Sequence, residues 1–354
     1  MKKSLIALAV LAASGAAMAQ SSVTLFGIMD TGVSYVNKDG AGDSRYGVGT
    51  SGNATSRLGL RGTEDLGGGL KAGFWLEGEI FGDDGNASGF NFKRESTVRL
   101  SGNFGEVRLG RELTPTFRAG LKYDLFGATG IGQNMGYRDW ASNGLADSNT
   151  IRSNNMVSYY TPNMSGFNAA VSYAFDEQPS GATKTGRYFG GNVGYDQGPL
   201  SVTLALAQLK TTAHGVAADR DEWALGASYN FGVAKVVGQV QQIKYKPSGL
   251  NSDKYNNYLL GVSAPVGGVG EVKLQYALYD QKAIDSKAHQ LSLGYVHNLS
   301  KRTALYGTVA YLKNKDDSVL GLQAKGVYSG EVKGSNGQGG QSQTGVQVGI
   351  RHAF

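Results

Sequence analysis

The side chains best suited to binding or catalysis are arginines and glutamates that alternate with apolar residues in short segments. Arg57 has the parity opposite to the leucines that follow it, and Arg152 has the same relation to the apolar residues after it. Glu77 and Glu79 are placed in this way in a third segment. A guanidinium stays protonated at any relevant pH and binds a carboxylate or phosphate as a fork. This pattern indicates recognition of anions, with glutamates available to hold or to neutralise the arginines.

Other kinds of chemistry find little support. The chain has no Cys, which excludes a disulfide scaffold, a thiolate zinc site and a cysteine nucleophile. Glycine clusters such as residues 67–69 lack the Lys-Ser/Thr that follows a phosphate-binding loop. No metal-ligand spacing and no hydrolase-like arrangement is found among the four histidines, His214, His289, His297 and His352. We expect no catalytic residue, no metal and no cofactor.

Strands are the elements that must position these residues, because the repeating pattern is alternation with a period of two. In residues 221–231 the odd positions carry Trp223 and other apolar side chains, whereas Glu222 lies on the even face. An even number of such segments suits a closed antiparallel barrel. Sixteen can be placed, near residues 22–36, 55–64, 70–81, 92–101, 104–111, 152–161, 166–176, 185–195, 199–211, 220–231, 233–245, 254–264, 269–281, 286–299, 302–314 and 342–354.

The connections between these segments alternate in length. Short turns rich in Gly, Asn and Pro stand between mostly longer polar stretches, among them residues 37–54, 212–219 and 315–341. Short turns on one side and long loops on the other are typical of outer-membrane barrels. The longest connection is residues 112–151, and a loop of this length in a compact protein is usually functional.

The start of the chain has the form of a secretory signal. A basic start and an apolar run precede the small-x-small motif AMA at residues 17–19. We expect residues 1–19 to be a signal peptide and residues 20–354 to form one barrel domain. The alternative is an N-terminal membrane anchor, although the apolar run is shorter than a spanning helix needs. The net charge of +6 is spread without a basic run of five, which argues against nucleic-acid binding.

An exported chain with this alternation could be a soluble sheet protein or a barrel in an outer membrane. Alternation alone does not separate the two. The non-apolar faces mix Arg, Glu, Gln and Asn with many of the 54 glycines, which suits a hydrated lumen with lipid against the apolar faces. Closure also satisfies every backbone group without a free edge. Sixteen strands enclose a lumen too wide for side chains to fill, so the pattern implies a water-filled passage.

Five stretches carry a specific combination of motifs: SVTLFGIMD at 22–30, SRLGLRGTEDLGGGL at 56–70, GEVRLGR at 105–111, VSYYTP at 157–162 and the terminal GIRHAF. Together they resemble the trimeric general porins of Gram-negative bacteria, and most of all the anion-selective porin of β-proteobacteria. The resemblance covers the chain from residue 20 onward. It implies an all-β fold, a 16-stranded antiparallel transmembrane β-barrel whose third extracellular loop folds inward. It also implies a homotrimer in the outer membrane.

The resemblance extends to individual charged residues. Arg57, Arg94 and Arg152 match the positions at which the anion-selective relatives place a basic cluster at the narrowest point of the pore. Residues 112–151 would be the inward loop, and the pore-lining acidic partners would be Glu77, Glu79 and Asp124. Arg94 conflicts with strict alternation, which points Lys93 to the lumen instead; a bulge or a later strand start would remove the conflict.

The expected function is passive diffusion of small hydrophilic solutes and ions through a water-filled channel, with anion preference from the arginine cluster. The expected partners are two further copies of the chain, outer-membrane lipid and lipopolysaccharide, and small anions and hydrophilic solutes. We expect no enzymatic activity and no nucleic-acid partner. The alternatives are a solute-specific channel, or an adhesin or enzyme that uses a filled barrel as a scaffold.

Overall fold

The computed structural model describes residues 22–37, 42–85, 91–136, 150–179, 184–213, 216–284 and 286–354. The predicted signal peptide, residues 1–19, lies outside the described residues. Within these ranges no helix combines the length and the apolar character needed to cross a membrane.

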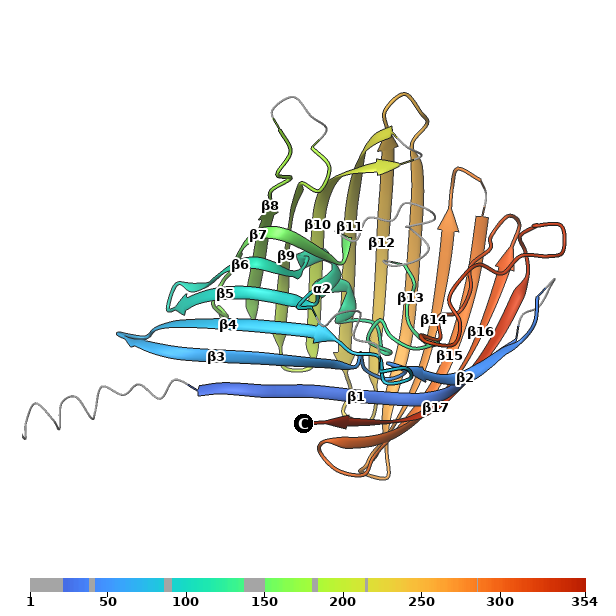
Figure 1. Cartoon of the computed structure of the whole chain (residues 1–354), viewed down its shortest axis with the longest axis horizontal. Helices are drawn as coiled ribbons and strands as arrows, with labels where there is room; N and C mark the ends of the chain where they lie inside the picture. Colours follow the sequence, from blue (N-terminus) through green and yellow to red (C-terminus); the bar gives the residue numbers. More distant parts are fainter. Residues whose placement is uncertain are drawn as a thin grey trace, which may run out of the picture.

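The described chain is almost entirely β-structure (Figure 1). The first eight strands and the helix are β1 (Ser22–Val36), β2 (Arg45–Thr50), β3 (Arg57–Gly67), β4 (Leu70–Glu79), β5 (Glu95–Gly102), β6 (Gly105–Leu113), α2 (Pro115–Leu121), β7 (Arg152–Tyr160) and β8 (Phe167–Ala174). The others are β9 (Tyr188–Gln197), β10 (Leu200–Ala213), β11 (Val216–Asn230), β12 (Lys235–Pro247), β13 (Asp253–Val266), β14 (Gly270–Gln281), β15 (Ser286–Asn298), β16 (Thr303–Lys315) and β17 (Ser342–Ala353).

The sheet closes on itself. From β3 onward each strand pairs antiparallel with the next, and β17 returns to pair with β1, where Ala353 lies opposite Ile28. Strands β2 and β3 both pair with β1, β2 opposite residues 31–36 and β3 opposite residues 22–28. They are therefore two halves of one barrel strand. The result is a closed 16-stranded antiparallel barrel, which confirms the predicted fold.

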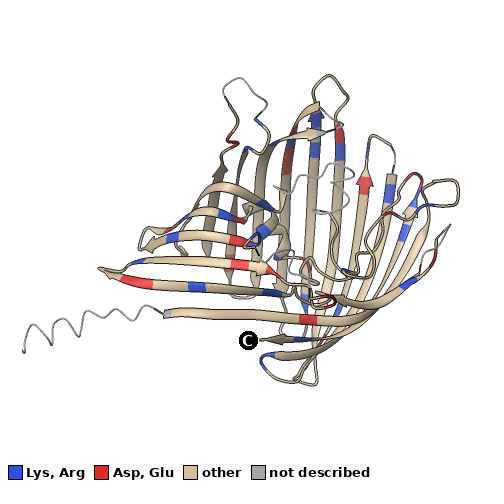
Figure 2. Cartoon of the chain, viewed as in Figure 1, with Lys and Arg blue, Asp and Glu red and all other residues tan. Residues whose placement is uncertain are grey.

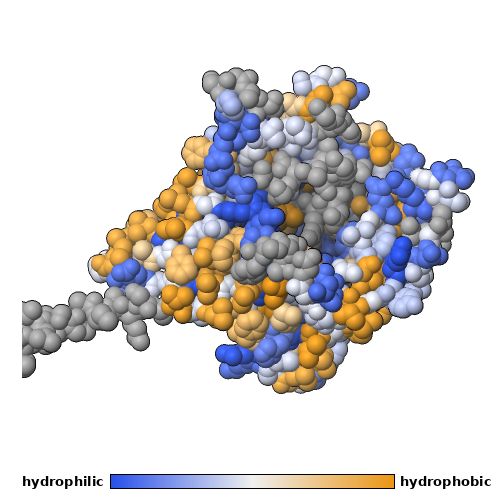
Figure 3. All heavy atoms as spheres, in the orientation of Figure 1, coloured by the Kyte–Doolittle hydropathy of each residue, from blue (hydrophilic) through white to orange (hydrophobic). Residues whose placement is uncertain are grey.

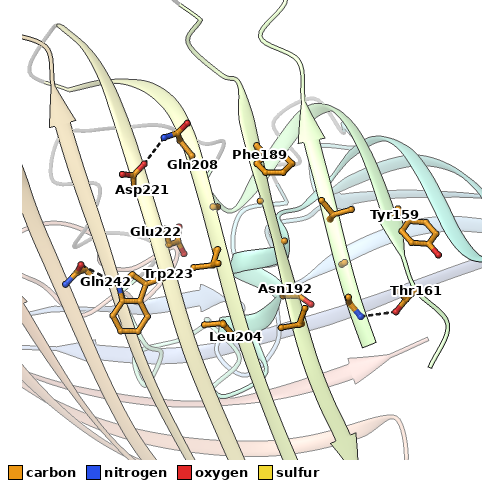
Figure 4. A pocket seen from close by; sticks show the side chains of 18 of the residues that line it. Tyr159, Thr161, Phe189, Asn192, Leu204, Gln208, Asp221, Glu222, Trp223 and Gln242 are labelled. Carbon is orange, nitrogen blue, oxygen red and sulfur yellow. Dashed lines mark hydrogen bonds between the residues drawn. The ribbon is translucent and has the colours of Figure 1, made fainter. Parts of the chain in front are cut away.

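Alternation along the strands separates an apolar outer face from a polar inner face. On β11, Trp223 and Leu225 are 36% and 45% exposed, whereas Glu222 and Ala224 are 3% and 2% exposed. The charged residues of β11–β16 gather toward the ends of the strands (Figure 2), and orange side chains cover the outer face of β3–β5 (Figure 3). Figure 4 shows Trp223 with its outward neighbours on β9 and β10. Lipid can therefore contact the exposed apolar face.

The third long loop folds into the barrel. After β6 the chain forms α2, whose first turn is capped by Thr114, because its Oγ1 accepts a hydrogen bond from the Phe117 amide (3.3 Å). The Tyr123 hydroxyl donates to Thr203 Oγ1 on β10 (2.8 Å), and the Met135 amide donates to the Tyr279 hydroxyl on β14 (3.0 Å). These contacts carry the loop across the lumen to the far wall. The helix itself was not predicted.

The last long loop, residues 316–341, also enters the barrel, which differs from the predicted polar connection. Leu322 and Ala324 are fully buried and join one apolar cluster with Ile131 and Met135 of the third loop. This cluster also includes inward residues of β12–β16. The two loops therefore pack inside the barrel against these strands.

Several predicted boundaries are wrong, and three of them change the expected loops or the site. Residues 37–54, expected to be a loop, contain β2; its short glycine-rich sequence hides the alternation. Residues 212–219 are not a long loop, because β10 continues to Ala213 and β11 begins at Val216. The segment expected at residue 92 begins at Glu95. Small and polar residues at strand ends carry too little hydrophobic contrast to define a period.

Candidate functional site

A cavity of about 600 Å³ lies between the wall formed by β3–β7 and the inward third loop. Residues 51 and 53–55 and the loop residues Phe117, Leu121 and Ala128 form part of its lining. Six basic side chains reach it, whereas Glu79 is its one acidic lining residue among those described. The six are Arg57, Lys93, Arg94, Arg111, Arg152 and Lys325.

Glu77 holds two of the predicted arginines. Its Oε1 lies 2.6 Å from Nε of Arg94 and 3.7 Å from Nε of Arg57, and its Oε2 accepts a hydrogen bond from the Trp75 indole (3.2 Å). The β3–β4 register explains the contact, because Glu77 lies opposite Gly59, one inward position along from Arg57. One carboxylate is thus shared between two guanidinium groups and cannot neutralise both.

Arg152 and Arg111 are held by neutral acceptors. Arg152 Nε donates to the Arg94 carbonyl (2.8 Å). Arg111 Nε donates to the Lys93 carbonyl (2.6 Å), and its terminal nitrogen donates to Asn154 Oδ1 (2.6 Å). Neither arginine makes an ion pair with a carboxylate in the described part of the chain. These bonds fix the orientation of the side chains and leave their charge available to the cavity.

Two of the six cations were not predicted. Lys325 comes from the last loop, where its carbonyl accepts the Thr50 amide (3.0 Å) and its ammonium group pairs with Glu79 (2.5 Å). Arg111 has the outward parity of Leu109, but the β6–β7 register shifts between Gly110 and Glu112. This bulge turns Arg111 toward the cavity rim. Neither placement has a local sequence signal, because one depends on loop packing and the other on a bulge.

The conflict between Arg94 and Lys93 is removed by the strand boundary. Strand β5 begins at Glu95, so alternation does not extend to either residue. Both line the cavity, with Lys93 exposed and Arg94 held against Glu77. The predicted cluster of Arg57, Arg94 and Arg152 is therefore brought together around one cavity.

Residues 5–317 match the Gram-negative porin family. The chain belongs to this family. It is 74% identical to outer membrane porin protein 32 of Delftia acidovorans over the full length of both chains. It is also 36% identical to an outer membrane porin protein of Bordetella pertussis, over 89% of this chain and 95% of the relative.

Solved structures agree with the fold of this porin. The anion-selective porin from Comamonas acidovorans is 72% identical and superimposes with a TM-score of 0.89, over 95% of this chain and all of the other. The trimer form of OmpT from Vibrio cholerae is 13% identical, with a TM-score of 0.70 over 94% of this chain and 99% of the other. The second likeness shows the fold alone. The chain is an outer-membrane β-barrel protein.

Asp124 was predicted to be an acidic partner of the pore arginines, but its carboxylate contacts other groups. Its carboxylate accepts hydrogen bonds from the amides of Phe126, Ala128 and Asn134 (2.8–3.0 Å) and from the side-chain amide of Gln275 on β14 (2.9 Å). No contact joins it to an arginine in the described residues. Asp124 therefore organises the third loop and anchors it to the far wall, because a short acidic side chain there satisfies backbone amides that lie inside the barrel.

Asp30, which the sequence did not single out, fixes the opposite rim of the cavity. Its carboxylate accepts the amides of Gly52, Asn53 and Ala54 (2.6–3.1 Å) and the hydroxyl of Tyr306 (2.6 Å). The same segment is joined to the third loop, because Thr129 Oγ1 donates a hydrogen bond to the Ser51 carbonyl. The passage is thus bounded by two segments, each organised by a buried carboxylate.

The other charges of the third loop lie away from the cavity or outside the described residues. Glu112 is buried and pairs with Arg108 (2.9 Å) and Arg118 (3.1 Å). Lys122 pairs with Asp196 on β9. Arg138, Asp139 and Asp147 lie outside the described residues, as does His214.

The described histidines do not gather into a site. His289, His297 and His352 contact Tyr276, Tyr295 and Thr303, respectively, on the outer face of the barrel. No group of three or more acidic or histidine side chains in the described residues could hold a metal ion.

Proposed function

We propose that this porin conducts small hydrophilic solutes by passive diffusion and prefers anions, with selectivity set at the cavity beside Arg57, Arg94 and Arg152. The observation that carries the proposal is the charge around that cavity. Six basic side chains line it, and the two carboxylates in contact with them are Glu77 and Glu79, which leaves an excess of 6 − 2 = 4 positive charges. Charges on one wall of a narrow, low-dielectric passage raise the local concentration of the opposite ion.

The strength of this field suits conduction. An anion ~8 Å from one arginine is attracted by ~0.5–2 kcal/mol, for effective dielectrics between those of water and a protein surface. Several such residues favour anions over cations without trapping them, and an ion that conducts must also leave its site. The apolar and small loop residues on the facing wall add no acidic charge to oppose this preference.

The relatives support the same proposal. A solved relative at 72% identity is described as an anion-selective porin. We further propose that the chain acts as a homotrimer, as the trimer form of OmpT does, that it contacts outer-membrane lipid and lipopolysaccharide, and that it has no enzymatic activity. Residues 1–19 would be removed as a signal peptide, leaving residues 20–354 as the barrel domain.

A planar-bilayer recording under a KCl gradient tests the proposal. We expect a reversal potential of the sign given by chloride permeation. The preference for anions over cations should be smaller at higher salt. The Debye length falls from about 10 Å at 0.1 M to about 3 Å at 1 M, so the arginines are screened from the passing ion. A cation-type reversal potential, or a bilayer without conductance, would contradict the proposal.

Replacing Glu77 by glutamine should increase the anion preference. The variant removes one negative charge beside the passage and leaves Arg57 and Arg94 without their shared partner. Loss of one charge at ~8 Å corresponds to about a two-fold or larger change in the permeability ratio. We also expect a lower unfolding temperature, since two partly buried guanidinium groups lose an acceptor. Glu64→Gln, on the exposed part of β3, is the matched control and should change neither quantity. An unchanged ratio in Glu77→Gln would contradict the prediction.

A further inference from the structure

A second arginine on β3 faces the lumen outside the cavity. Arg61 lies four residues after Arg57 and has the same inward parity, so the two backbone positions are about 13 Å apart along the strand. Arg61 is exposed and does not line the cavity. It lies toward the short turn that joins β3 to β4, and short turns face the periplasm in barrels of this kind. Arg61 therefore stands on the lumen wall between the cavity and the periplasmic end.

Two aromatic rings hold the Arg61 guanidinium. Its Cζ atom lies 5.2 Å from the ring centroid of Phe26 on β1 and 5.2 Å from that of Trp75 on β4. The two ring centroids are 4.8 Å apart, with an angle of 56° between the planes. Arg99 on β5 also contacts the Trp75 ring (5.0 Å). A guanidinium that stacks on ring faces keeps its N–H groups free to donate in its own plane.

Gly59 allows the Phe26 ring to lie against the wall, since the two residues are directly opposite in the β1–β3 register. A Cβ atom on Gly59 would stand 2.4 Å from Phe26 Cζ and 2.7 Å from the Leu76 carbonyl oxygen, so a side chain there would displace the ring. Phe26 is partly exposed and has no polar atom, unlike the inward Tyr160 and Tyr306, whose hydroxyls donate to carboxylates. An apolar ring beside water gains free energy by contact with the ring of a solute.

The charge of Arg61 is not balanced as that of its neighbours is. Arg99 pairs with Glu95, and one of its terminal nitrogens lies 3.8 Å from Glu106. Arg108 pairs with Glu106 in turn (3.0 Å). Among the residues that the structure describes, Arg61 makes no ion pair with a carboxylate of the chain. Its charge and its N–H donors are therefore available to an anion in the lumen.

We propose that Arg61, Phe26 and Trp75 form a binding site for aromatic carboxylates, of which benzoate is the simplest. The carboxylate accepts hydrogen bonds from the guanidinium, and the ring of the solute packs against Phe26. Trp75 holds Arg61 and Phe26 in place. An inorganic anion or an aliphatic acid can use the charge but not the ring, so the site distinguishes among anions of equal charge. This inference rests on the proposed channel function, because the solute reaches the wall through the lumen.

The test compares three carboxylates of the same charge, namely benzoate, cyclohexanecarboxylate and acetate. The half-blocking concentration of each acid is measured from the KCl current in a planar bilayer. Saturation-transfer NMR with the porin in detergent micelles measures binding without conduction. We expect benzoate to block at a concentration about five-fold lower than cyclohexanecarboxylate does, because only benzoate has an aromatic face to pair with Phe26. Acetate should block least.

Two variants separate the ring from the charge. Phe26→Leu keeps Arg61 and should make the half-blocking concentrations of benzoate and cyclohexanecarboxylate nearly equal. Arg61→Gln should raise that of benzoate about five-fold, because the charge-assisted hydrogen bonds are lost. The ring control is Phe167→Leu, whose ring packs on Tyr195 in a similar geometry (4.7 Å, 55°) but on the outer face. The charge control is Lys71→Gln, an exposed inward residue of β4, which should affect the three acids equally.

Equal half-blocking concentrations of benzoate and cyclohexanecarboxylate in the wild type would overturn the proposal, whether or not the variants fold. A difference that persists in Phe26→Leu, or that is lost equally in Phe167→Leu, would also overturn it. Phe26→Leu should keep the KCl conductance of the wild type, which shows that the barrel is intact. A wild type that conducts KCl with anion preference but gives no saturation-transfer signal for benzoate lacks this site alone. A wild type without conductance contradicts the channel function itself.

Discussion

Replacing Arg57, Arg94 and Arg152 together by serine shifts the permeability ratio strongly toward cations. The variant reduces the basic side chains at the cavity from six to three, namely Lys93, Arg111 and Lys325. It also releases Glu77, which then has no arginine partner among the described residues. Each removed arginine takes away ~0.5–2 kcal/mol of attraction between the cavity and a passing anion. We expect the ratio to fall by about ten-fold or more, measured as the reversal potential under a KCl gradient.

The control for this variant is Arg302→Ser, which removes an exposed arginine at a short turn on the other side of the barrel. Its reversal potential should equal that of the wild type. The single variants are informative as well. Arg57 and Arg94 share one carboxylate, so their effects should not add, whereas the effect of Arg152, held by a carbonyl, should be nearly independent. An unchanged reversal potential in the triple variant would place the source of selectivity elsewhere.

The parts of this site that were predictable are those that depend on local alternation. Arg57 and Arg152 sit within strands, where a period of two determines which face a side chain takes. The resemblance to known porins supplied Arg94, which alternation had placed on the wrong face because the strand begins only at Glu95, after this residue. Glu77 follows from the same alternation, and its contact with two arginines follows from the β3–β4 register.

The parts that were not predictable depend on contacts between distant segments. Lys325 reaches the cavity only because the last loop packs into the barrel, and Arg111 only because of a bulge beside Gly110, where φ is 130°. A residue without a side chain adopts this backbone conformation without steric cost. The position of the two loops inside the barrel likewise depends on packing between side chains that are far apart in sequence, such as Ile131 and Leu322.

The arginines therefore indicated an anion site in the sequence, whereas the balance of positive and negative charge at that site could not be predicted. Counting charges along the sequence leaves open whether the arginines are neutralised. The structure separates cations held by carboxylates from cations held by carbonyls and amides, as for Arg152 and Arg111. Hydrogen bonds to neutral acceptors orient a guanidinium without cancelling its field. The anion preference therefore depends on the partners of the basic residues as much as on their number.

Asp124→Ala should enlarge the pore, because Asp124 organises the loop that narrows it. Its carboxylate accepts three backbone amides of the loop and the amide of Gln275 on β14. Alanine leaves these donors unsatisfied at a cost of about 1–3 kcal/mol each where they remain buried. The segment from residue 124 to residue 134 is then held less firmly against the wall. We expect higher single-channel conductance, faster swelling of liposomes with larger sugars and weaker anion preference.

The closed barrel should survive this change, because its strand ladder does not include Asp124. Thermal unfolding followed by circular dichroism would show a transition close to that of the wild type. Asp196→Ala is the matched control, since Asp196 binds Lys122 of the same loop at an exposed position and holds no loop amide of that segment. It should leave conductance nearly unchanged. If Asp124→Ala conducted like the wild type, other contacts such as those of Tyr123, Thr129 and Met135 would be enough to hold the loop, and the carboxylate would have no part in setting the width of the passage.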